Sequence, residues 1–414
     1  MAKQLDIFSE KGGTAADTGR RWKRYPAYKD SGIEWLGKIP EHWLSAHLRY
    51  FVRVRSGDAP PEDRSPNDDV PVYGANGVIG YCSRPNSERS RVSIGRVGAV
   101  GEVHQTPPRV WISDNALIVD PNPGELLPAY LASLLRTLDL ASEANRNAQP
   151  LITATQVKAR QALIPPIHEQ RAIAAFLDRE TARIDALIEK KHQQIELLQE
   201  KRTALVSHAV TKGLDPTVPV RDSGIEWLAR IPEHWLSAGL RHFVRVRSGE
   251  APPEDKSTTG EVPIYGANGL RGYAHAYTHE GEHVLIGRQG ALCGCINYAK
   301  GRFWASEHAV VVTPTGGTDV TWLGELLRSM NLNRYSQSAA QPGLAVETLV
   351  ALFLPVPPVS EQQVLSDSLH RETARIGALV TKVEESIGTL REYRTALISA
   401  AVTGKIDVRG EVAS

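Results

Sequence analysis

The chain has 414 residues, of which 41% are hydrophobic and 23% charged, and 48 basic against 47 acidic side chains leave a net charge of +1. This composition is typical of a globular protein of two or three domains, and the absence of any apolar run of about 18 residues excludes a transmembrane helix, so we expect no membrane partner. Three cysteines (Cys82, Cys293 and Cys295) and no secretory leader predict a cytoplasmic protein without disulfides. Near-neutral charge argues against a histone-like polycation but allows a basic DNA-binding face balanced by acidic residues elsewhere.

The chain is a tandem duplication. Residues 30–63 and 222–255 align at an offset of 192, and 29 of the 34 positions are identical because only positions 37, 38, 47, 50 and 58 differ. The same offset relates the two Tyr-Gly-Ala-Asn-Gly segments that begin at Tyr73 and Tyr265. A repeat of this length predicts one module of about 190 residues used twice.

Each module is predicted to contain a mixed α/β head followed by a long helix. After a tail at residues 1–24 that we expect to be disordered, we place head 1 at residues 25–166 and helix 1 at 167–213. Head 2 then occupies 214–358, helix 2 occupies 359–404, and a C-terminal tail occupies 405–414. The heads contain short β-rich runs and many Gly and Pro turns, whereas the helical segments contain no proline.

The helical segments carry heptad repeats of apolar residues, which are typical of coiled coils. Lys191 interrupts the first repeat, Leu187 and Ile195 widen its stripe, and the second repeat is unbroken. Gly377 and Gly388 lie inside the second helix and should weaken it. The repeats consist of Leu177, Ile184, Leu198 and Leu205 in the first helix, and Leu369, Ile376, Val383, Leu390 and Leu397 in the second.

The connection between the modules limits how they can be arranged. Helix 1 should be about 65 Å long at about 1.5 Å per residue, whereas the linker at 213–221 reaches about 30 Å when fully extended. We therefore expect the heads at opposite ends of a rod in which the helices pair as an antiparallel coiled coil. The predicted fold class is α+β with pseudo-twofold symmetry, which suits duplex DNA with its own approximate dyad.

Three recurring motifs in the heads are candidates for DNA contact. Alternation along a strand at 51–55 places two arginines on one face, and the second head repeats it. The Tyr-Gly-Ala-Asn-Gly turns offer an aromatic ring and an amide, and the Ile-Gly-Arg-x-Gly loops offer an arginine for phosphate or guanine. Each motif is also common in purely structural settings. The candidate residues are Arg53, Arg55, Tyr73, Asn76 and Arg96 in head 1, and Arg245, Arg247, Tyr265, Asn268 and Arg288 in head 2.

Several segments together resemble the DNA-specificity (S) subunits of type I restriction-modification systems. They are Tyr25–Leu36, the Ile-Pro-Glu-His-Trp segments (39–43 and 231–235), the Ile-Gly-Arg-x-Gly loops, the Pro-x-x-Glu-Gln segments (166–170 and 358–362), and the ending Ala401–Asp407. The resemblance covers nearly all of the chain after residue 24.

The resemblance implies two target-recognition domains that each bind half of a split target on double-stranded DNA. It implies that the helices set the gap between the halves and hold two methyltransferase subunits, with translocase-endonuclease subunits joining the complex. The chain itself would be non-catalytic and hold no cofactor or metal, because ATP, magnesium and S-adenosylmethionine belong to the partners. Unlike stretches, such as 83–91 against 274–282, would let the half-sites differ.

Other functions leave weaker signals. The chain lacks the Asn/Asp-Pro-Pro-aromatic site of an adenine methyltransferase and the phosphate-binding P-loop. Residues 254–256 imitate a nuclease metal site that the first head does not repeat, and Cys293 and Cys295 lack a second ligand pair. We expect the His-Trp pairs of the Ile-Pro-Glu-His-Trp segments to be structural. The remaining alternative is a coiled-coil protein-interaction scaffold that binds no nucleic acid.

Overall fold

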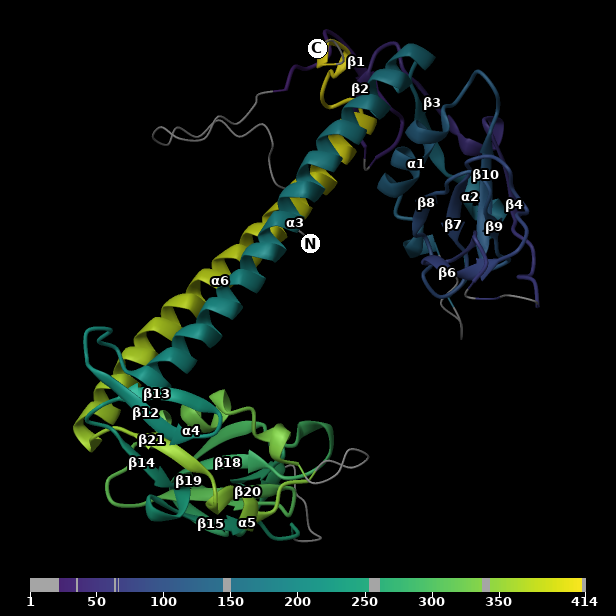
Figure 1. The fold of residues 1–414 in the computed structure, drawn as a ribbon. Coiled ribbons are helices and arrows are strands. Elements are labelled where there is room, and N and C mark those ends of the chain that lie inside the picture. The colour runs from purple at the N-terminus through teal and green to yellow at the C-terminus, as the bar shows by residue number, and fades with distance from the viewer. Residues whose placement is uncertain are drawn as a thin grey trace. The chain divides into compact units, whose positions relative to one another are not determined.

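The computed structural model describes residues 22–34, 36–62, 65, 67–143, 150–252, 261–336 and 343–411. The chain divides into two compact units (Figure 1). Unit 1 combines Met1–Lys190 with Glu385–Ser414, and unit 2 is the continuous segment Lys191–Glu384. Within the described part of the chain, no helix is both long enough and apolar enough to cross a membrane.

Unit 1 is built around head 1, whose main sheet has the strand order β4-β10-β7-β8. Strand β10 is buried on both faces: Leu117 and Val119 contact the core that includes helix α1, and Ala116 and Ile118 lie in a second cluster beside Tyr73. The strands are β1 (Tyr28–Asp30), β2 (Lys38–Pro40), β3 (Leu44–His47), β4 (Val52–Ser56), β5 (Val70–Gly74), β6 (Gly77–Cys82), β7 (Val92–Gly95), β8 (Val103–Gln105), β9 (Trp111–Ile112), β10 (Ala116–Pro121) and β11 (Gln161–Ile164), and the short helices are α1 (Pro128–Thr137) and α2 (Ala154–Ala159).

Unit 2 repeats these elements around head 2, but its main sheet has six strands in the order β15-β20-β18-β19-β16-β17. Small two-stranded sheets, β12 with β13 and β14 with β21, repeat β1 with β2 and β3 with β11. The elements are β12 (Val220–Ile225), β13 (Leu228–Pro232), β14 (Leu236–Gly239), β15 (Val244–Ser248), β16 (Val262–Gly266), β17 (Gly269–Ala274), β18 (His279–Gly287), β19 (Ile296–Ala305), β20 (Ala309–Pro314) and β21 (Phe353–Val356), with helices α4 (Val320–Ser329) and α5 (Val346–Val350).

The sheets differ because of two prolines. Strand β19 runs without a break from Ile296 to Ala305, whereas its counterpart in head 1 is divided into β8 and β9 with Pro107 and Pro108 between them. Proline cannot donate a ladder hydrogen bond and is excluded from the middle of a sheet. Head 1 therefore has a four-stranded sheet and a separate three-stranded sheet, β6-β5-β9, where head 2 has one continuous sheet.

The two long helices are α3 (Ile167–Lys212) and α6 (Val359–Val402), which agrees with the proline-free segments of the sequence. Gly213 and Gly404 follow them with positive φ angles of 79° and 70°, as expected for C-terminal glycine caps. The predicted heptad residues are buried or half-buried, but Leu187 is 41% exposed. The prediction that Leu187 widens the apolar stripe was wrong, because Ile188 on the other side of the stripe packs on the core instead.

In each unit, one end of α3 and one end of α6 belong to the same hydrophobic core. In unit 1, Phe176 and Leu177 cluster with Leu397 and Ala401, and Arg394 donates to Asp185 over 2.9 Å. In unit 2, the core includes Val206, Ala209 and Val210 of α3 together with Leu365 and Leu369 of α6. The apolar faces of both helices are therefore buried inside each unit.

The residues that flank head 1 and those that follow α6 lie together in unit 1 (Figure 1). The Asp407 amide donates to the Lys23 carbonyl over 2.7 Å, and the Tyr28 hydroxyl donates to the Gly404 carbonyl over 3.1 Å. Trp22, only 6% exposed, packs edge-on against Phe176. The expected tail at 1–24 is thus too long by at least three residues, because an apolar Trp22 anchors 22–24 to unit 1; residues 1–21 lie outside the described part.

Candidate nucleic-acid interface

The arginine pairs lie on edge strands of both main sheets. On β4, Arg53 and Arg55 are exposed and alternate with Val52 and Val54, which are buried. On β15, Arg245 and Arg247 are likewise exposed, and β4 and β15 each stand at the end of the strand order. The alternation predicted from the sequence is confirmed. Each head therefore presents two guanidinium groups to solvent on one face of an edge strand, an arrangement suited to phosphate contact.

The Tyr-Gly-Ala-Asn-Gly segments form the tips of β-hairpins. In head 1, β5 and β6 are joined by the two-residue turn Ala75-Asn76, with Gly74 paired to Gly77. Asn76 and its counterpart Asn268 are exposed, so their side-chain amides are free to contact other molecules from the hairpin tips. The tyrosines are different: Tyr73 and Tyr265 are half-buried against apolar clusters of the head.

Each Tyr side chain has a structural environment that reduces its availability. The Tyr73 ring lies 6.3 Å from the ring of His104, and the Tyr265 ring lies edge-on 5.8 Å from Phe303. The carbonyl of Tyr73 accepts a hydrogen bond from the Ser113 amide, and the carbonyl of Tyr265 accepts one from Ser306. The tyrosines thus anchor the hairpins, and their half-buried side chains leave only part of each residue accessible.

The Ile-Gly-Arg-x-Gly loops pack against the hairpin tips. A Cβ atom on Gly95 would lie 2.6 Å from the Ala75 carbonyl oxygen, and one on Gly287 would lie 2.6 Å from that of Ala267. These glycines are required because the two backbones approach closely at this point. The loop and the turn therefore form one rigid corner in each head.

Arg96 and Arg288 stand directly after those glycines and are half-buried. Arg96 donates from Nη1 to the Ser56 hydroxyl over 3.1 Å, which links the loop to the end of the arginine strand β4. The backbone amide of Arg288 donates to the His308 carbonyl over 2.9 Å. The structure thus brings Arg96 beside β4 and the hairpin tip. One nitrogen of its guanidinium already donates a hydrogen bond within the head.

The Ile-Pro-Glu-His-Trp and Pro-x-x-Glu-Gln segments join each head to the start of its helix. In unit 1, Glu169 accepts hydrogen bonds from Trp43 Nε1 (2.9 Å) and lies 2.6 Å from His42 Nε2. In unit 2, Glu361 lies 2.8 Å from His234 Nε2 and 3.2 Å from Trp235 Nε1. The structural role predicted for the His-Trp pairs is confirmed, and their partner, 126 or 127 residues away, is the glutamate that sequence reasoning did not assign.

The neighbouring glutamines complete this junction. Gln170 accepts a hydrogen bond from the Leu127 amide (2.9 Å) and donates to the Pro165 carbonyl (2.9 Å). Gln362 accepts from the Asp319 amide and donates to the Pro357 carbonyl in the same way. Both glutamines are buried, so the amide groups hold the first turn of each helix against the loop that opens helix α1 or α4.

In unit 1, residues from the segments before β1 and after α6 also contact Glu169. The Tyr25 hydroxyl donates to Glu169 over 3.1 Å, and the Arg409 guanidinium lies 4.8 Å from the Tyr25 ring and 3.8 Å from Glu169. Burial, and then the negative charge of Glu169, raise the pKa of Tyr25 well above its ordinary value, so the hydroxyl remains a donor. Glu169 is 1% exposed as a side chain, compared with 29% for Glu361.

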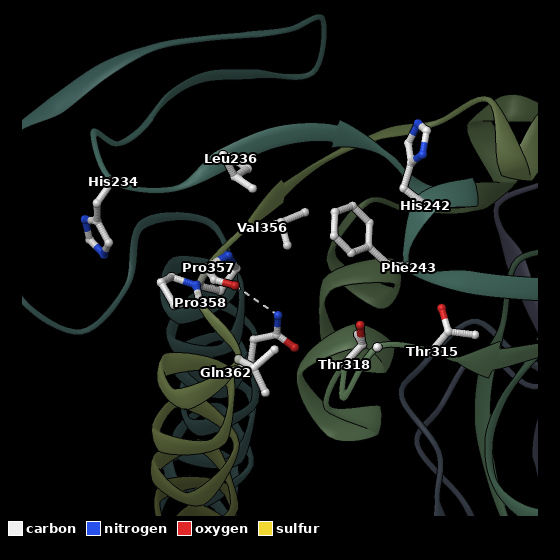
Figure 2. Close-up of a pocket in the computed structure, with 12 residues that line it drawn as sticks. His234, Leu236, His242, Phe243, Thr315, Thr318, Val356, Pro357, Pro358 and Gln362 are labelled. Carbon is white, nitrogen blue, oxygen red and sulfur yellow. Dashed lines mark hydrogen bonds between the residues drawn. The ribbon is translucent and has the colours of Figure 1, made fainter.

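A cavity of about 560 Å³ lies at the corresponding junction of unit 2 (Figure 2). Figure 2 shows Leu236, Val356 and Phe243 beside the hollow, with Gln362 reaching the carbonyl of Pro357. Its wall is largely apolar, and His234 is turned to Glu361. None of the predicted DNA-contact residues line the hollow, so it is separate from the arginine strands and the hairpin tips.

The sequence signals for metal binding can be followed only where the structure describes the chain. Among the described residues, no group of three His, Cys, Asp or Glu side chains is placed to hold a metal ion. Cys293 is buried, and burial raises the pKa of its thiol, which keeps it in the unreactive protonated form. The nuclease-like Glu254-Asp255-Lys256 segment lies outside the described residues.

Comparison with known proteins agrees with the architecture. A family model, the type I restriction modification DNA specificity domain, matches residues 40–197 and 232–387. The Escherichia coli type I restriction enzyme EcoprrI specificity subunit is 50% identical over 109 residues, which cover 26% of this chain and 27% of that protein. The chain thus aligns with about a quarter of the length of this first relative.

Two longer alignments cover nearly the whole chain. A putative type I restriction enzyme MjaX specificity subunit from Methanocaldococcus jannaschii is 22% identical over 421 residues, or 90% of this chain and 96% of that one. A solved structure concerning complex assembly and conformational transition of the type I R-M system aligns with 88% of this chain and 98% of that chain, at 17% identity and a TM-score of 0.70. The latter supports the fold, two tandem mixed domains with long helices.

Proposed function

The chain belongs to the type I restriction modification DNA specificity domain family, and from this premise we propose that it is the non-catalytic specificity subunit of a type I restriction-modification complex. Each head would bind one half of a bipartite target on double-stranded DNA and so direct methylation or cleavage by partner subunits. Two separate family matches, one over each head and most of its helix, carry this proposal. The exposed arginine pairs on β4 and β15 support it, because each head offers the same basic edge.

We further infer that α3 and α6 pair as an antiparallel coiled coil with pseudo-twofold symmetry, keeping the heads apart. The shared cores in each unit support this pairing, because the beginning of α3 packs with the end of α6 in unit 1 and the converse holds in unit 2. The Arg394–Asp185 ion pair, between residues 209 apart in sequence, is a second contact of this kind. The paired helices would then set the distance between the two bound half-sites.

The partners follow from this function. Two methyltransferase subunits would bind the helical region, and translocase-endonuclease subunits would join them to cleave unmodified DNA. ATP, magnesium and S-adenosylmethionine would belong to those partners, whereas this chain would position DNA through its own side chains. Arg53, Arg55, Arg245 and Arg247 would contact phosphates, and Asn76 and Asn268 would face base edges from the hairpin tips.

Fluorescence anisotropy with duplex DNA tests the proposal. The chain with its methyltransferase partner should bind with a log–log salt slope of about −5 or steeper, because several phosphate contacts release counterions. Replacing Arg53 and Arg55 together with alanine should weaken binding to all sequences and reduce the slope by about 2. Binding that is absent or independent of salt would instead favour a protein-interaction scaffold.

The spacing role has its own test. Inserting seven residues, about two helical turns, at matching positions of α3 and α6 keeps the heptad register and should lengthen the gap in the methylated sequence. The bases within each half-site should stay the same, since the heads are untouched. Methylome sequencing of a strain that expresses the complex measures both quantities. An altered half-site with an unchanged gap would contradict the spacer role.

A further inference from the structure

Both hairpin tips contain a β-bulge at the same place. In head 1, Tyr73 pairs with Val78 and Val72 pairs with Gly80, so Ile79 is the extra residue of the β6 strand. In head 2, Tyr265 pairs with Leu270 and Ile264 pairs with Gly272, which leaves Arg271 as the extra residue of β17. A bulge re-aims the side chain of its extra residue relative to the regular ladder. The two heads therefore present the residues at positions 79 and 271 in the same way.

A glycine on the opposite strand makes room for each of these side chains. A Cβ atom on Gly74 would lie 2.8 Å from Cγ2 of Ile79, and one on Gly266 would lie 2.1 Å from Cδ of Arg271. No other residue fits these positions without displacing the bulge side chain. The aliphatic part of each bulge side chain thus rests on a glycine, which fixes its direction, while its end stays in solvent: Ile79 is 49% exposed, and Arg271 is exposed.

The residues around the bulge are the same in both heads, whereas the extra residue itself differs. Tyr-Gly-Ala-Asn-Gly precedes the bulge and Gly-Tyr follows it in each hairpin, whereas the two positions between them are Val-Ile in one and Leu-Arg in the other. Val78 and Leu270 are chemically alike. The substitution of arginine for isoleucine is therefore the one change of chemical class within a hairpin that is otherwise preserved.

We propose that Ile79 and Arg271 are specificity-determining residues, each reading one base pair of its own half-site in the major groove; this rests on the DNA-binding function proposed above. β6 and β17 are edge strands that begin at the hairpin tips, so their exposed side chains can reach base edges. In the major groove the arginine fork matches O6 and N7 of guanine, and an apolar side chain contacts the thymine methyl group. Arg271 therefore selects a G·C pair in the half-site of head 2, and Ile79 selects an A·T pair at the equivalent position for head 1.

Exchange of the two side chains is the direct test, in complexes that contain the methyltransferase subunits. Ile79→Arg should convert one A·T position of one half-site to G·C, and Arg271→Ile should do the reverse in the other half-site. Methylome sequencing records the recognised sequence. Competition with duplexes altered at each base pair should show a tenfold to hundredfold loss of discrimination at that single position.

Two further variants distinguish a loss of base-pair discrimination from a loss of folding stability. Gly266→Ala should displace the flexible Arg271 side chain and weaken discrimination at the same base pair while the thermal unfolding midpoint changes little. Arg230→Ala removes an exposed arginine from β13 of the same unit and should leave discrimination unaltered. Wild-type sequence preference retained in all three variants at positions 79, 271 and 266 would overturn this inference alone, whereas a wild-type complex with no sequence preference would overturn the proposed function.

Discussion

Heads 1 and 2 are alike where they meet the long helices and unlike in how their sheets are divided. The His-Trp-Glu contacts are reproduced within a few tenths of an ångström at positions 42, 43 and 169 and at 234, 235 and 361. In contrast, the strands beyond the hairpins form two sheets in head 1 and one in head 2. The two copies have thus kept the same contacts between head and helix, while the division of their sheets has changed.

One pair of neighbouring residues inside the main sheet also differs between the heads. Arg91 of head 1 donates to Asp120, while the corresponding His283 of head 2 lies 3.0 Å from the Thr313 hydroxyl and is 6% exposed. His283 also packs against Phe303 and His279, and burial, followed by the electrostatic effect of neighbouring His283, lowers the pKa of His279. An ion pair in one head and an aromatic cluster in the other occupy equivalent places, so the heads need not respond alike to mutation.

The largest expected difference concerns the junction glutamates. Glu169→Ala should lower the free energy of unfolding by about 3–5 kcal/mol, because it leaves the buried donors of Tyr25 and Trp43 without an acceptor. Glu361→Ala should cost about 1–2 kcal/mol, since water can reach the site. Chemical denaturation followed by tryptophan fluorescence compares the two, and equal losses would show that the contacts of Tyr25 and Arg409 add nothing.

The next effect concerns the continuous sheet of head 2. Lys300 corresponds to Pro107, and Lys300→Pro should cost about 3 kcal/mol because it places a proline in the middle of β19. Lys300→Ala, which removes only the exposed ion pair with Glu282, should leave stability nearly unchanged because solvent screens that pair. Hydrogen exchange of the β18–β19 amides should increase in the proline variant alone; unchanged protection would mean that Pro107 does not divide the sheet of head 1.

A smaller and opposite effect is expected in α6. A Cβ atom on Gly377 or Gly388 would meet nothing within 4 Å, so neither glycine is needed for close packing. Replacing either with alanine should raise the free energy of unfolding by about 1 kcal/mol, because glycine is a poor helix former. Gly377 belongs to unit 2 and Gly388 to unit 1, so the pair tests both units by thermal denaturation. A loss of stability in either variant would reveal a backbone requirement at that position.

The smallest effect concerns acid sensitivity. Partial burial alone raises the pKa of Asp407, but hydrogen bonds and charge from Arg409 outweigh it and hold the pKa below the ordinary value. The stabilisation is therefore present above about pH 4 and is lost as the pH falls through the lowered pKa. Asp407→Asn should make the unfolding midpoint less dependent on pH between about 5 and 3.

The matched residue in unit 2 is Asp215, which is bonded to Thr217 instead of an arginine. Hydrogen bonds from the Thr217 hydroxyl and amide lower the pKa of Asp215, which is fully exposed. Asp215→Asn should therefore alter the acid limb less than Asp407→Asn does, because solvent screens the Thr217 contacts. A larger effect at Asp215 would contradict the importance assigned to Arg409.

Much of this architecture could be predicted from local signals in the sequence. The absence of proline between Pro166 and Pro216 and the glycine at 213 defined helix α3 closely, since these residues act through the backbone of their own segment. The alternation of Val and Arg on β4 likewise predicted which side chains are exposed. The repeat then extended each of these predictions to the second module.

The remaining features depend on contacts between distant residues. The partner of His42 is Glu169, 127 residues away, and no spacing rule connects a loop histidine to the first turn of a helix. The bulge at Ile79 depends on the pairing register of β5 with β6, which a run of exposed apolar residues leaves undetermined. The signal that could have revealed it was the unlike dipeptide inside an otherwise repeated hairpin.

Unit 2 is one continuous stretch of chain, but unit 1 is assembled from two stretches separated by all of unit 2. On the ribosome, residues 191–384 are therefore made before the segment that carries Leu397, Ile406 and Val408, each fully buried in the core of unit 1. Part of the core of unit 1 therefore stays exposed to solvent until nearly the whole polypeptide has been synthesised. A chain truncated within α6 should therefore expose apolar surface in unit 1, and chaperones and proteases should act on that unit.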